Sequence, residues 1–351
     1  RKVCYRMTQI KVDTIADAAG TGAADFADGI TIAGGALSAL NTAEYYSSAS
    51  EPTSPKNGAI WWDTTNEKVM VYIAGEFKEV ELGASASSSI DISQASYDSV
   101  SFSVASQDNI PFGMAFNTDG TKMYICGWQY DSVYQYSLST GFDLSTASYD
   151  SVSFSTASQD DFPMGVLFSP DGTKMYIVGL SNKKIFQYSL TTAYDLSTAS
   201  YSNISFSTLN EDTGVYDIAF NGDGTKMYAL AGSATNDAVF QYSVSTAYNV
   251  STATYDSVSF SVASQSTAPQ GFRFNSDGTQ LFIIGQGENA VFQYSLSTAF
   301  DLSTISYDSV SFSVASQDSG STNQINFSAD YTKLYILGAT NDTVYQYSTG
   351  L

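Results

Sequence analysis

Histidine is absent from the 351 residues of this chain, and cysteine occurs only twice, at Cys4 and Cys126. Without histidine there is no Ser-His-Asp triad, no Cys-His pair and no histidine-ligated metal site. The two cysteines lie in different modules without paired-thiol spacing, so neither a disulfide framework nor a zinc site is indicated. A phosphate-cradling Gly-Lys-Ser/Thr motif is missing too. These absences exclude many of the common catalytic arrangements, and no cofactor is expected.

Charged residues are also scarce, at 14% of the chain, and one sign dominates. The 35 acidic residues against 14 basic ones give a formal net charge of -21. Such a field repels phosphate backbones and anionic lipid surfaces, so nucleic acid is not an expected partner. No apolar run reaches about 18 residues and no secretory leader is recognisable, so membrane insertion is not expected. The segment from Met7 onward reads like an ordinary protein start, and residues 1–6 are expected to be a processing or assignment artefact.

What the chain does contain is an internal repeat that runs from Tyr97 to the end. Each unit has an Asp-Gly-Thr-Lys-like turn before an apolar strand, except that Tyr331 replaces glycine in the fifth copy. Asp-Gly between two strands is a strong hairpin signal because glycine accepts positive φ, so we interpret these aspartates as turn residues rather than metal ligands. With a period of 52 to 54 residues, the turn aspartates are Asp119, Asp171, Asp223, Asp277 and Asp330.

Two further segments recur with the same period: Gln-Tyr-Ser, and Tyr-Asp-Ser-Val-Ser-Phe-Ser or a variant of it. Each unit thus offers four short β-like runs, which is typical of a propeller blade. A solenoid would need distinct end caps, whereas this repeat starts with a Tyr97-type strand and stops after a Gln346-type strand. Pairing these two ends completes a fifth blade and hides its edges. We therefore predict an all-β fold, a five-bladed β-propeller closed by pairing its N- and C-terminal strands.

The residues before the propeller are predicted to form an arm and a small module. Residues 1–42 are rich in Ala, Gly, Asp and Thr and are expected to be an extended N-terminal attachment or assembly arm. Its short apolar stretches include Ile10 and Val12, which we expect at an oligomer or attachment contact. The arm has too few apolar residues to fold well alone, so it is expected to act with a partner.

Residues 43–83 predict a small β-hairpin module, since two or three strands surround turns there. So small a unit buries a limited core, and Trp61 and Trp62 need partner surface from another chain or domain. Oligomerisation is therefore favoured. A Ser/Ala-rich linker over residues 84–96 is predicted to lead into the propeller over residues 97–351.

Parts of the chain resemble known families. The Pro-rich lead, the Gly58–Thr64 run and the Tyr72–Phe77 pattern resemble a module common in bacteriophage tail-fibre and virion proteins. The opening Met7–Ile15 is similar to the starts of structural proteins from phages of marine bacteria. The repeats resemble propeller repeats of the YVTN and WD40-like kind, although the Trp-Asp pair of WD40 repeats is missing. The resemblance implies a virion protein, assembled in the host cytoplasm, whose N-terminal region binds other virion proteins and forms a homotrimer.

Comparison of the five units shows where they differ. Differences concentrate in the loop between successive units and in the loop between the second and third strands of each unit. Because strand direction alternates, both loop sets emerge on one face, and the constant Asp-Gly turns and Ser-Thr-Ala connections emerge on the other. We call these the variable face and the uniform face. The variable face comprises residues 107–112, 159–164, 210–216, 265–270 and 317–324, with 127–131, 179–184, 232–238, 285–290 and 338–343.

We predict that the variable face binds a ligand, because binding residues concentrate on loops held by a rigid scaffold. Ordinary drift in exposed loops is the alternative. Trp128 and Tyr130 have no equivalent in the other units. The predicted aromatic anchors are Trp128, Tyr130, Phe162 and Tyr216, and the predicted charged discriminators are Lys183, Lys184, Glu211 and Glu288.

The expected function is that of a non-enzymatic virion structural protein, a tail-fibre or spike component whose propeller contacts a host-surface glycan or protein. A capsid or filament decoration or spacer, and a bacterial surface lectin or adhesin, remain alternatives. A glycosidase needs two uniquely placed carboxylates, and the few acids outside the repeat register show no matched acid and base. No metal site is predicted, although Ca²⁺ among the acidic loops stays open.

Overall fold

The computed structural model describes residues 89–211, 214–233 and 236–351, together with Thr53 and six short strands nearer the N-terminus. They belong to two compact units, Arg1–Ser88 and Ser89–Leu351. In the first unit β1 and β2 pair antiparallel, and a four-stranded sheet joins β3 parallel to β4 and then β5 and β6 antiparallel. These strands are β1 (Ile10–Lys11), β2 (Thr31–Ile32), β3 (Tyr45–Ser48), β4 (Ile60–Asp63), β5 (Lys68–Ile73) and β6 (Glu76–Glu79). Val12 and the side chains of Ile10, Trp61 and Trp62 lie outside the described residues.

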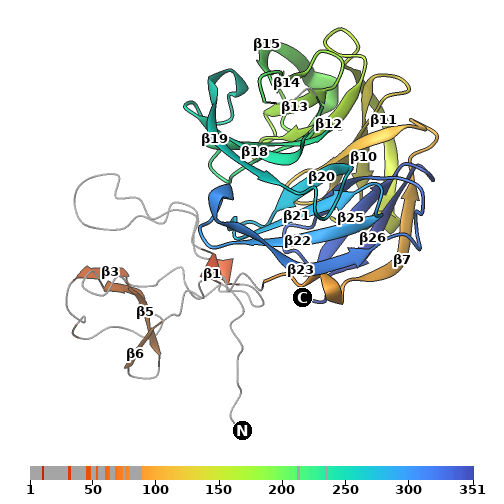
Figure 1. Cartoon of the computed structure of the whole chain (residues 1–351). Helices are drawn as coiled ribbons and strands as arrows, with labels where there is room; N and C mark the ends of the chain where they lie inside the picture. The colour runs from red at the N-terminus through yellow and green to blue at the C-terminus, as the bar shows by residue number, and fades with distance from the viewer. Residues whose placement is uncertain are drawn as a thin grey trace. The chain divides into compact units, whose positions relative to one another are not determined.

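The second unit is a five-bladed β-propeller of four-stranded antiparallel sheets, which confirms the predicted fold (Figure 1). The innermost strands contact one another around the ring; they are β8 (Pro111–Phe116), β12 (Pro163–Phe168), β16 (Val215–Phe220), β20 (Pro269–Phe274) and β24 (Thr322–Phe327). The second strands are β9 (Lys122–Gly127), β13 (Lys174–Gly179), β17 (Lys226–Ser233), β21 (Gln280–Gly285) and β25 (Lys333–Gly338). The third strands are β10 (Ser132–Leu138), β14 (Lys184–Leu190), β18 (Asn236–Val244), β22 (Ala290–Leu296) and β26 (Thr343–Ser348).

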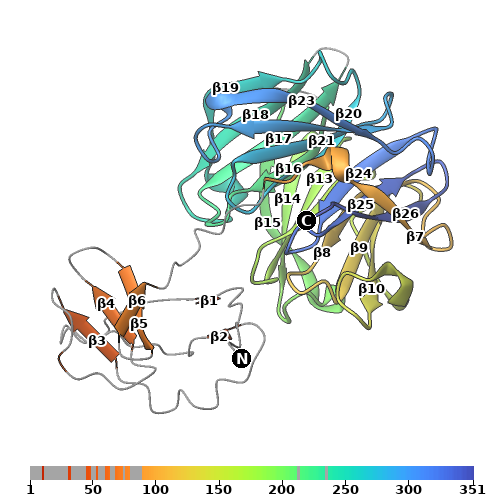
Figure 2. The same cartoon turned by 90° about the horizontal axis from the view of Figure 1, so that it is seen from below.

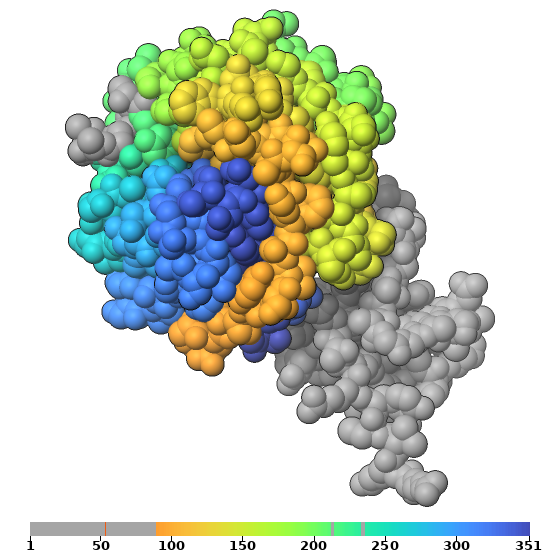
Figure 3. Space-filling model, turned by 90° about the vertical axis from the view of Figure 1, so that its right-hand side faces the viewer, coloured from red at the N-terminus to blue at the C-terminus, as the bar shows by residue number. Residues whose placement is uncertain are grey.

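The outer strands complete the blades and close the ring. They are β11 (Ala147–Ser155), β15 (Ala199–Ser207), β19 (Ala253–Ser261), β23 (Ile305–Ser313) and, in the fifth blade, β7 (Ser96–Ser103). Strand β7 pairs antiparallel with β26, with Tyr97 opposite Tyr347. Figures 1 and 3 show this orange N-terminal strand beside the blue C-terminal segment. The predicted closure by the two chain ends is therefore confirmed.

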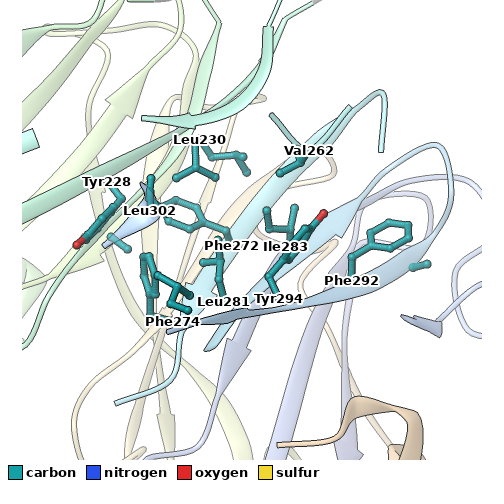
Figure 4. Close-up of a cluster of buried hydrophobic side chains, with 14 residues drawn as sticks. Tyr228, Leu230, Val262, Phe272, Phe274, Leu281, Ile283, Phe292, Tyr294 and Leu302 are labelled. Carbon is teal, nitrogen blue, oxygen red and sulfur yellow. The ribbon is translucent and has the colours of Figure 1, made fainter. Parts of the chain in front are cut away.

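The blades pack face to face, so their inner strands are buried on both sides and consist of successive apolar residues. In β21 all six residues are buried. Phe272 and Ile283 of the fourth blade share one cluster with Tyr228 and Leu230 of the third (Figure 4). Each outer strand alternates exposed and partly buried residues instead, and each bulges at a residue with positive φ, such as Ser99 at 60°. Bulges of this kind discourage edge-to-edge pairing.

The recurrent Gln-Tyr-Ser segment links each blade to the next. Gln135 Oε1 accepts a hydrogen bond from Leu196 N at 2.9 Å, at the start of a 3-10 turn in the following blade. The same bond joins Gln187 to Val250, Gln241 to Leu302, Gln293 to Ile92 and Gln346 to Leu144. The turns are η2 (Ile92–Gln94), η3 (Leu144–Thr146), η4 (Leu196–Thr198), η5 (Val250–Thr252) and η6 (Leu302–Thr304). The recurrent glutamine thus forms one hydrogen bond between each pair of neighbouring blades around the whole ring.

The end of the predicted linker belongs to the propeller. Ile90 and Ile92 are buried to 2% and 0% exposure against the fourth and fifth blades. Gln280 Oε1 accepts from Ile90 N at 2.8 Å, and its Nε2 donates to Ile90 O at 2.9 Å. In the other blades a tyrosine hydroxyl donates a hydrogen bond to the equivalent carbonyl, as Tyr176 does to Tyr248 O at 2.7 Å. The fourth blade has phenylalanine there, and Gln280 supplies the missing bond. We call residues 89–95 the strap.

Tyr331, the residue that breaks the Asp-Gly pattern, also compensates for the chain ends. In the other blades the turn glycine packs against an aromatic residue from the third-to-fourth-strand loop, as Gly120 does against Phe142. The fifth blade lacks that continuous loop and has Ile90 in its place. The Tyr331 ring lies 5.5 Å from Phe327, as the Phe142 ring lies 5.6 Å from Phe116. The ring therefore fills the same space from the opposite loop.

Restoring the repeat consensus at this turn is expected to destabilise the protein. Tyr331→Gly relieves a positive φ of 60°, which is worth about 1 kcal/mol, but removes a mostly buried ring, and such losses cost about 3–5 kcal/mol. We expect a net loss of about 2–4 kcal/mol by urea denaturation. Tyr331→Asn, which tolerates positive φ but also lacks the ring, is the matched control and should lose a similar amount. Stabilisation by Tyr331→Gly would contradict this role.

Candidate functional site

The two variable loop sets lie on the same face of the propeller. Trp128, between β9 and β10, packs on Phe162, between β11 and β12, with ring centroids 4.1 Å apart. Phe112 at the start of β8 continues the contact, 5.8 Å from Phe162. These three rings, the aromatic wall, span the first and second blades. Trp128 and Phe162 were predicted as anchors, whereas Phe112 was not.

The variable face also carries three of the four large hydrophobic side chains that are exposed in the described part of the chain. Trp128, Tyr130 and Leu209 are 42%, 58% and 54% exposed, and all three belong to or adjoin its loops. In the described part of the chain only one other large hydrophobic side chain is comparably exposed, Leu351 at the C-terminus. Exposed aromatic residues gathered on one face are typical of binding surfaces.

The remaining predicted residues occupy separate loops. Lys184 is exposed at the start of β14, and Lys183 has a φ of 54° with its carbonyl bound to Thr208 N at 3.1 Å. Glu211 is partly buried at the edge of the described residues, and one of its carboxylate oxygens is buried without a hydrogen-bond partner there. Tyr216 covers Gly232, since a Cβ at that glycine would lie 2.7 Å from its ring. Their part in binding stays a prediction.

Glu288 has a structural contact that the sequence did not indicate. In three blades a loop aspartate covers the last glycine of the second strand, and Asp160 there accepts from Asn182 N at 2.7 Å. The fourth blade has Ser266 at that position, and Glu288 Oε2 accepts from its hydroxyl at 2.6 Å. A Cβ on Gly285 would lie 2.5 Å from the same Oε2. Glu288 therefore supplies the carboxylate that Ser266 lacks.

This exchange predicts a compensated pair of substitutions. Glu288→Gln removes a charge-assisted hydrogen bond and should cost about 1–2 kcal/mol in the free energy of unfolding. Adding Ser266→Asp restores the carboxylate in the form that the other blades use, and should recover most of that loss. Thermal unfolding of the wild type, both single variants and the double variant measures the coupling. Additive losses would show that the two residues do not replace one another.

A buried ion pair blocks the middle of the ring. The third residue of the inner strand is glycine in three blades but Asp217 and Gln324 in the others, and the fifth residue is Arg273 in the fourth blade. Arg273 Nη1 donates to Asp217 Oδ2 at 2.6 Å, and Nη2 reaches across to Met114 O at 3.3 Å. Burial raises the pKa of the Asp217 carboxyl, while the adjacent guanidinium favours its charged form. A column-by-column comparison of the inner strands would have revealed this pair.

A chain of amide groups adjoins the ion pair on the variable side. Gln270 Nε2 donates to Gln286 Oε1 at 3.2 Å, and Gln286 Nε2 donates to Ser321 Oγ at 2.5 Å. Ser321 Oγ bonds Asn323 Oδ1 at 3.2 Å, and Asn323 Nδ2 donates to Pro111 O at 2.8 Å. This amide belt runs from the fourth blade through the fifth to the first. No member of it was predicted from the sequence.

Carboxylates surround these groups and make the face electronegative. Burial raises the pKa of Asp108, Asp131 and Asp342, and neighbouring carboxylates raise it further. Among the described residues no group of three or more His, Cys, Asp or Glu side chains is arranged to hold a metal ion. Burial is therefore the main cause of the raised pKa values, and repulsion between neighbouring carboxylates adds to it. An anionic ligand would meet the same repulsion.

The uniform face carries grooves between neighbouring blades. One of them, of about 820 Å³, lies between the fifth and first blades and is lined by Asp98, Asp119 and Lys333 among others. Lys333 Nζ donates to Asp98 at 2.7 Å, and the same pair recurs as Lys122 with Asp150 in the first blade. These charged side chains thus join strands within one blade. Nowhere in the described part is there a helix long and apolar enough to span a membrane.

Comparison with known proteins finds matches among solved structures alone. No family model and no curated protein matches this sequence. Among solved structures, a functionally unknown protein from Desulfotomaculum acetoxidans is 14% identical, with a TM-score of 0.41 over 65% of this chain and 62% of its own. A candidate 6-phosphogluconolactonase from Bacteroides uniformis is 13% identical, with a TM-score of 0.44 over 84% of this chain and 77% of its own. One from Bacteroides fragilis is 15% identical, with a TM-score of 0.41 over 58% of this chain and 55% of its own.

This chain therefore spans less than two thirds of the length of the Desulfotomaculum acetoxidans and Bacteroides fragilis proteins. The lactonase names belong to those proteins. At such identities and TM-scores the similarity does not carry an activity across, because one propeller scaffold hosts many functions.

Proposed function

We propose that this chain is a non-enzymatic attachment protein, of the kind found in tail fibres or spikes of virus particles, whose variable face binds a host surface. The observation that carries the proposal is the gathering of Trp128, Tyr130 and Leu209, the large exposed hydrophobic side chains, on the face whose loops differ between blades. A scaffold that keeps one face constant while the other diversifies suits ligand recognition.

The positions of the propeller's two ends agree with this role. The strap enters beside Gln280, next to the Asp-Gly turns, and Gly350 packs against Gln94 at the same face. Both ends therefore leave from the uniform face, opposite the aromatic wall. A chain tethered by its N-terminal unit is free to present the variable face to a ligand. That N-terminal unit is proposed to assemble with further copies or with other particle proteins.

The acidic groups support binding rather than catalysis. Glu288 is bonded to Ser266, and Asp217 is bonded to Arg273 in the middle of the ring. Asp108 and Asp160 accept backbone N–H groups of their own loops, from Ile110 and Phe162, at 2.8 Å each. Acid-base hydrolysis by two carboxylates needs one carboxyl free to deliver a proton and another to activate water. These carboxyls are instead engaged in holding loops and strands.

The test is binding of the fluorescently labelled full chain to intact cells from a panel of bacterial strains. We expect saturable binding to a subset of strains, and a loss of at least tenfold in affinity when Trp128, Tyr130 and Leu209 are all changed to serine. Leu351→Ser is the matched control, because it removes the one comparably exposed hydrophobic residue on the uniform face. It should bind like the wild type.

Two outcomes would overturn the proposal. Equal loss in the triple variant and in Leu351→Ser would mean that general stickiness, not the variable face, produces the binding. Absence of binding to every strain, with the propeller folded, would favour a decoration or spacer. Sedimentation of the full chain and of residues 89–351 then reports whether the N-terminal unit assembles into an oligomer. An attachment protein and a decoration or spacer both require that assembly, whereas a monomeric lectin does not.

A further inference from the structure

The centre of the variable face is chemically divided. The aromatic wall of Phe112, Phe162 and Trp128 covers the first and second blades, and the amide belt covers the fourth and fifth. The two meet at Pro111 and Phe112, where Asn323 holds the Pro111 carbonyl at 2.8 Å. An apolar surface thus joins a row of fixed hydrogen-bonding groups at the start of the inner strands, a place that we call the mouth.

Buried members of the amide belt fix the positions of its accessible members. Gln270 and Asn323 are buried, at 9% and 2% exposure, while Gln286 and Ser321 are partly exposed. The buried amides hold the accessible ones in place through the bonds at 3.2 Å to Gln286 and to Ser321. An amide nitrogen has two donor hydrogens, and Gln286 uses one of them on Ser321. Donor and acceptor capacity therefore remains at a preorganised position.

We infer that this mouth binds a neutral carbohydrate, with the C–H face of a sugar ring on Trp128 and Phe162 and hydroxyl groups bonded to Gln286 and Ser321. The inference rests on the proposed function and names its ligand class. Sugars combine an apolar ring face with a rim of hydroxyls, which matches an aromatic surface beside amides. The surrounding carboxylates select against acidic sugars, because like charges repel.

A peptide ligand fits this mouth less well. An extended peptide adds to an open sheet edge, and the free edges belong to the outer strands such as β11 and β15, on the rim. An amphipathic helix needs an apolar groove, and half of this mouth is lined by amides instead. A basic segment would be drawn to the carboxylates but would leave the amide belt without partners.

The first experiment is binding of the labelled full chain to an array of neutral, sialylated and sulfated oligosaccharides. We expect neutral oligosaccharides among the ligands, and at least tenfold weaker binding for Trp128→Ala and for Gln286→Ala. The Gln286→Glu variant keeps the size but loses the donor, and should also bind weakly. Leu351→Ser should be unaffected. Binding to acidic oligosaccharides alone, or neutral binding that survives both alanine changes, would overturn the inference.

The second experiment separates this inference from the proposed function. Cells of a strain that binds the protein are treated either with periodate, which cleaves vicinal diols of sugars, or with a broad protease. Loss of binding after periodate and its survival after protease support a carbohydrate. Loss after protease alone means that a protein is the receptor, which refutes the carbohydrate but leaves the attachment function standing. If no strain binds and the array is empty, both fail.

Discussion

Asp217→Ala is expected to lower the free energy of unfolding by about 3–5 kcal/mol, because it leaves the Arg273 guanidinium buried without its counter-charge. Arg273 is 8% exposed, so water cannot replace the lost carboxylate, and the backbone N–H groups of Ile218 and Phe272 lose their acceptor as well. Urea denaturation followed by tryptophan fluorescence measures the change, with the slope of the transition as a check for two-state behaviour.

The first blade provides the matched control for this pair. It has Gly113 and Ala115 where the other two blades have Asp217 and Arg273. The double variant Asp217→Gly with Arg273→Ala copies the first blade and removes both charges together, so it should lose less stability than Asp217→Ala alone. This is expected of a buried ion pair when removing one partner lowers the free energy of unfolding more than removing both. A double variant less stable than the single one would show that the pair itself, not the orphaned charge, is decisive.

Removal of the strap is expected to have the other large effect. A chain beginning at residue 96 keeps β7 but loses buried Ile90 and Ile92, each worth about 1.5–3 kcal/mol. It also removes the strap partners of Gln280 and of the Gln293 Oε1 atom, at about 1–3 kcal/mol for each side chain. The loss of 5 kcal/mol or more is comparable to the whole stability of many domains. A chain beginning at residue 89 should unfold at the same temperature as the propeller does in the full chain.

Milder variants keep this prediction testable if the shortened chain does not fold. Ile92→Val reproduces Val250, its counterpart in the third blade, and should cost about 0.5–1.5 kcal/mol. Gln280→Lys restores the repeat consensus but removes the bonds to Ile90, and should cost more than Ile92→Val. Equal thermal stability of chains beginning at residues 89 and 96 would refute a role for the strap.

The repeat made the architecture predictable, because regular spacing implies regular blades and two half-blades at the ends imply a closed ring. The residues that depart from the repeat were harder to interpret. Gln280 supplies hydrogen bonds to Ile90, which lies 190 positions away in the sequence. Tyr331 compensates for the loop that the chain ends interrupt. Each residue looks like a random departure from the repeat when the units are compared in sequence, because the contact that explains it depends on the interrupted chain ends.

The variable face was predictable for the same reason, because the repeat shows which loops differ, and its binding of a ligand stays a prediction. Trp128 was singled out because nothing equivalent occurs in the other units, and the structure places its ring against that of Phe162, another predicted anchor. Phe112, Gln286 and Ser321 lie within the predicted variable loops but were not named individually, because their contacts depend on how neighbouring blades meet. Ring closure brings together residues that are far apart in the sequence and individually ordinary.

The positions of the chain ends also determine how the propeller would bear a mechanical load. The tether enters at the uniform face, and β7 runs from Ser96 there to Ser103 near the variable face. If the chain is anchored through its N-terminal unit, as proposed, a pull on a ligand bound to the variable face would act along β7. The hydrogen bonds from β7 to β26 are perpendicular to the strands, so they would be loaded together in shear instead of opening one at a time. The closing strand of the ring is thus oriented to resist detachment forces.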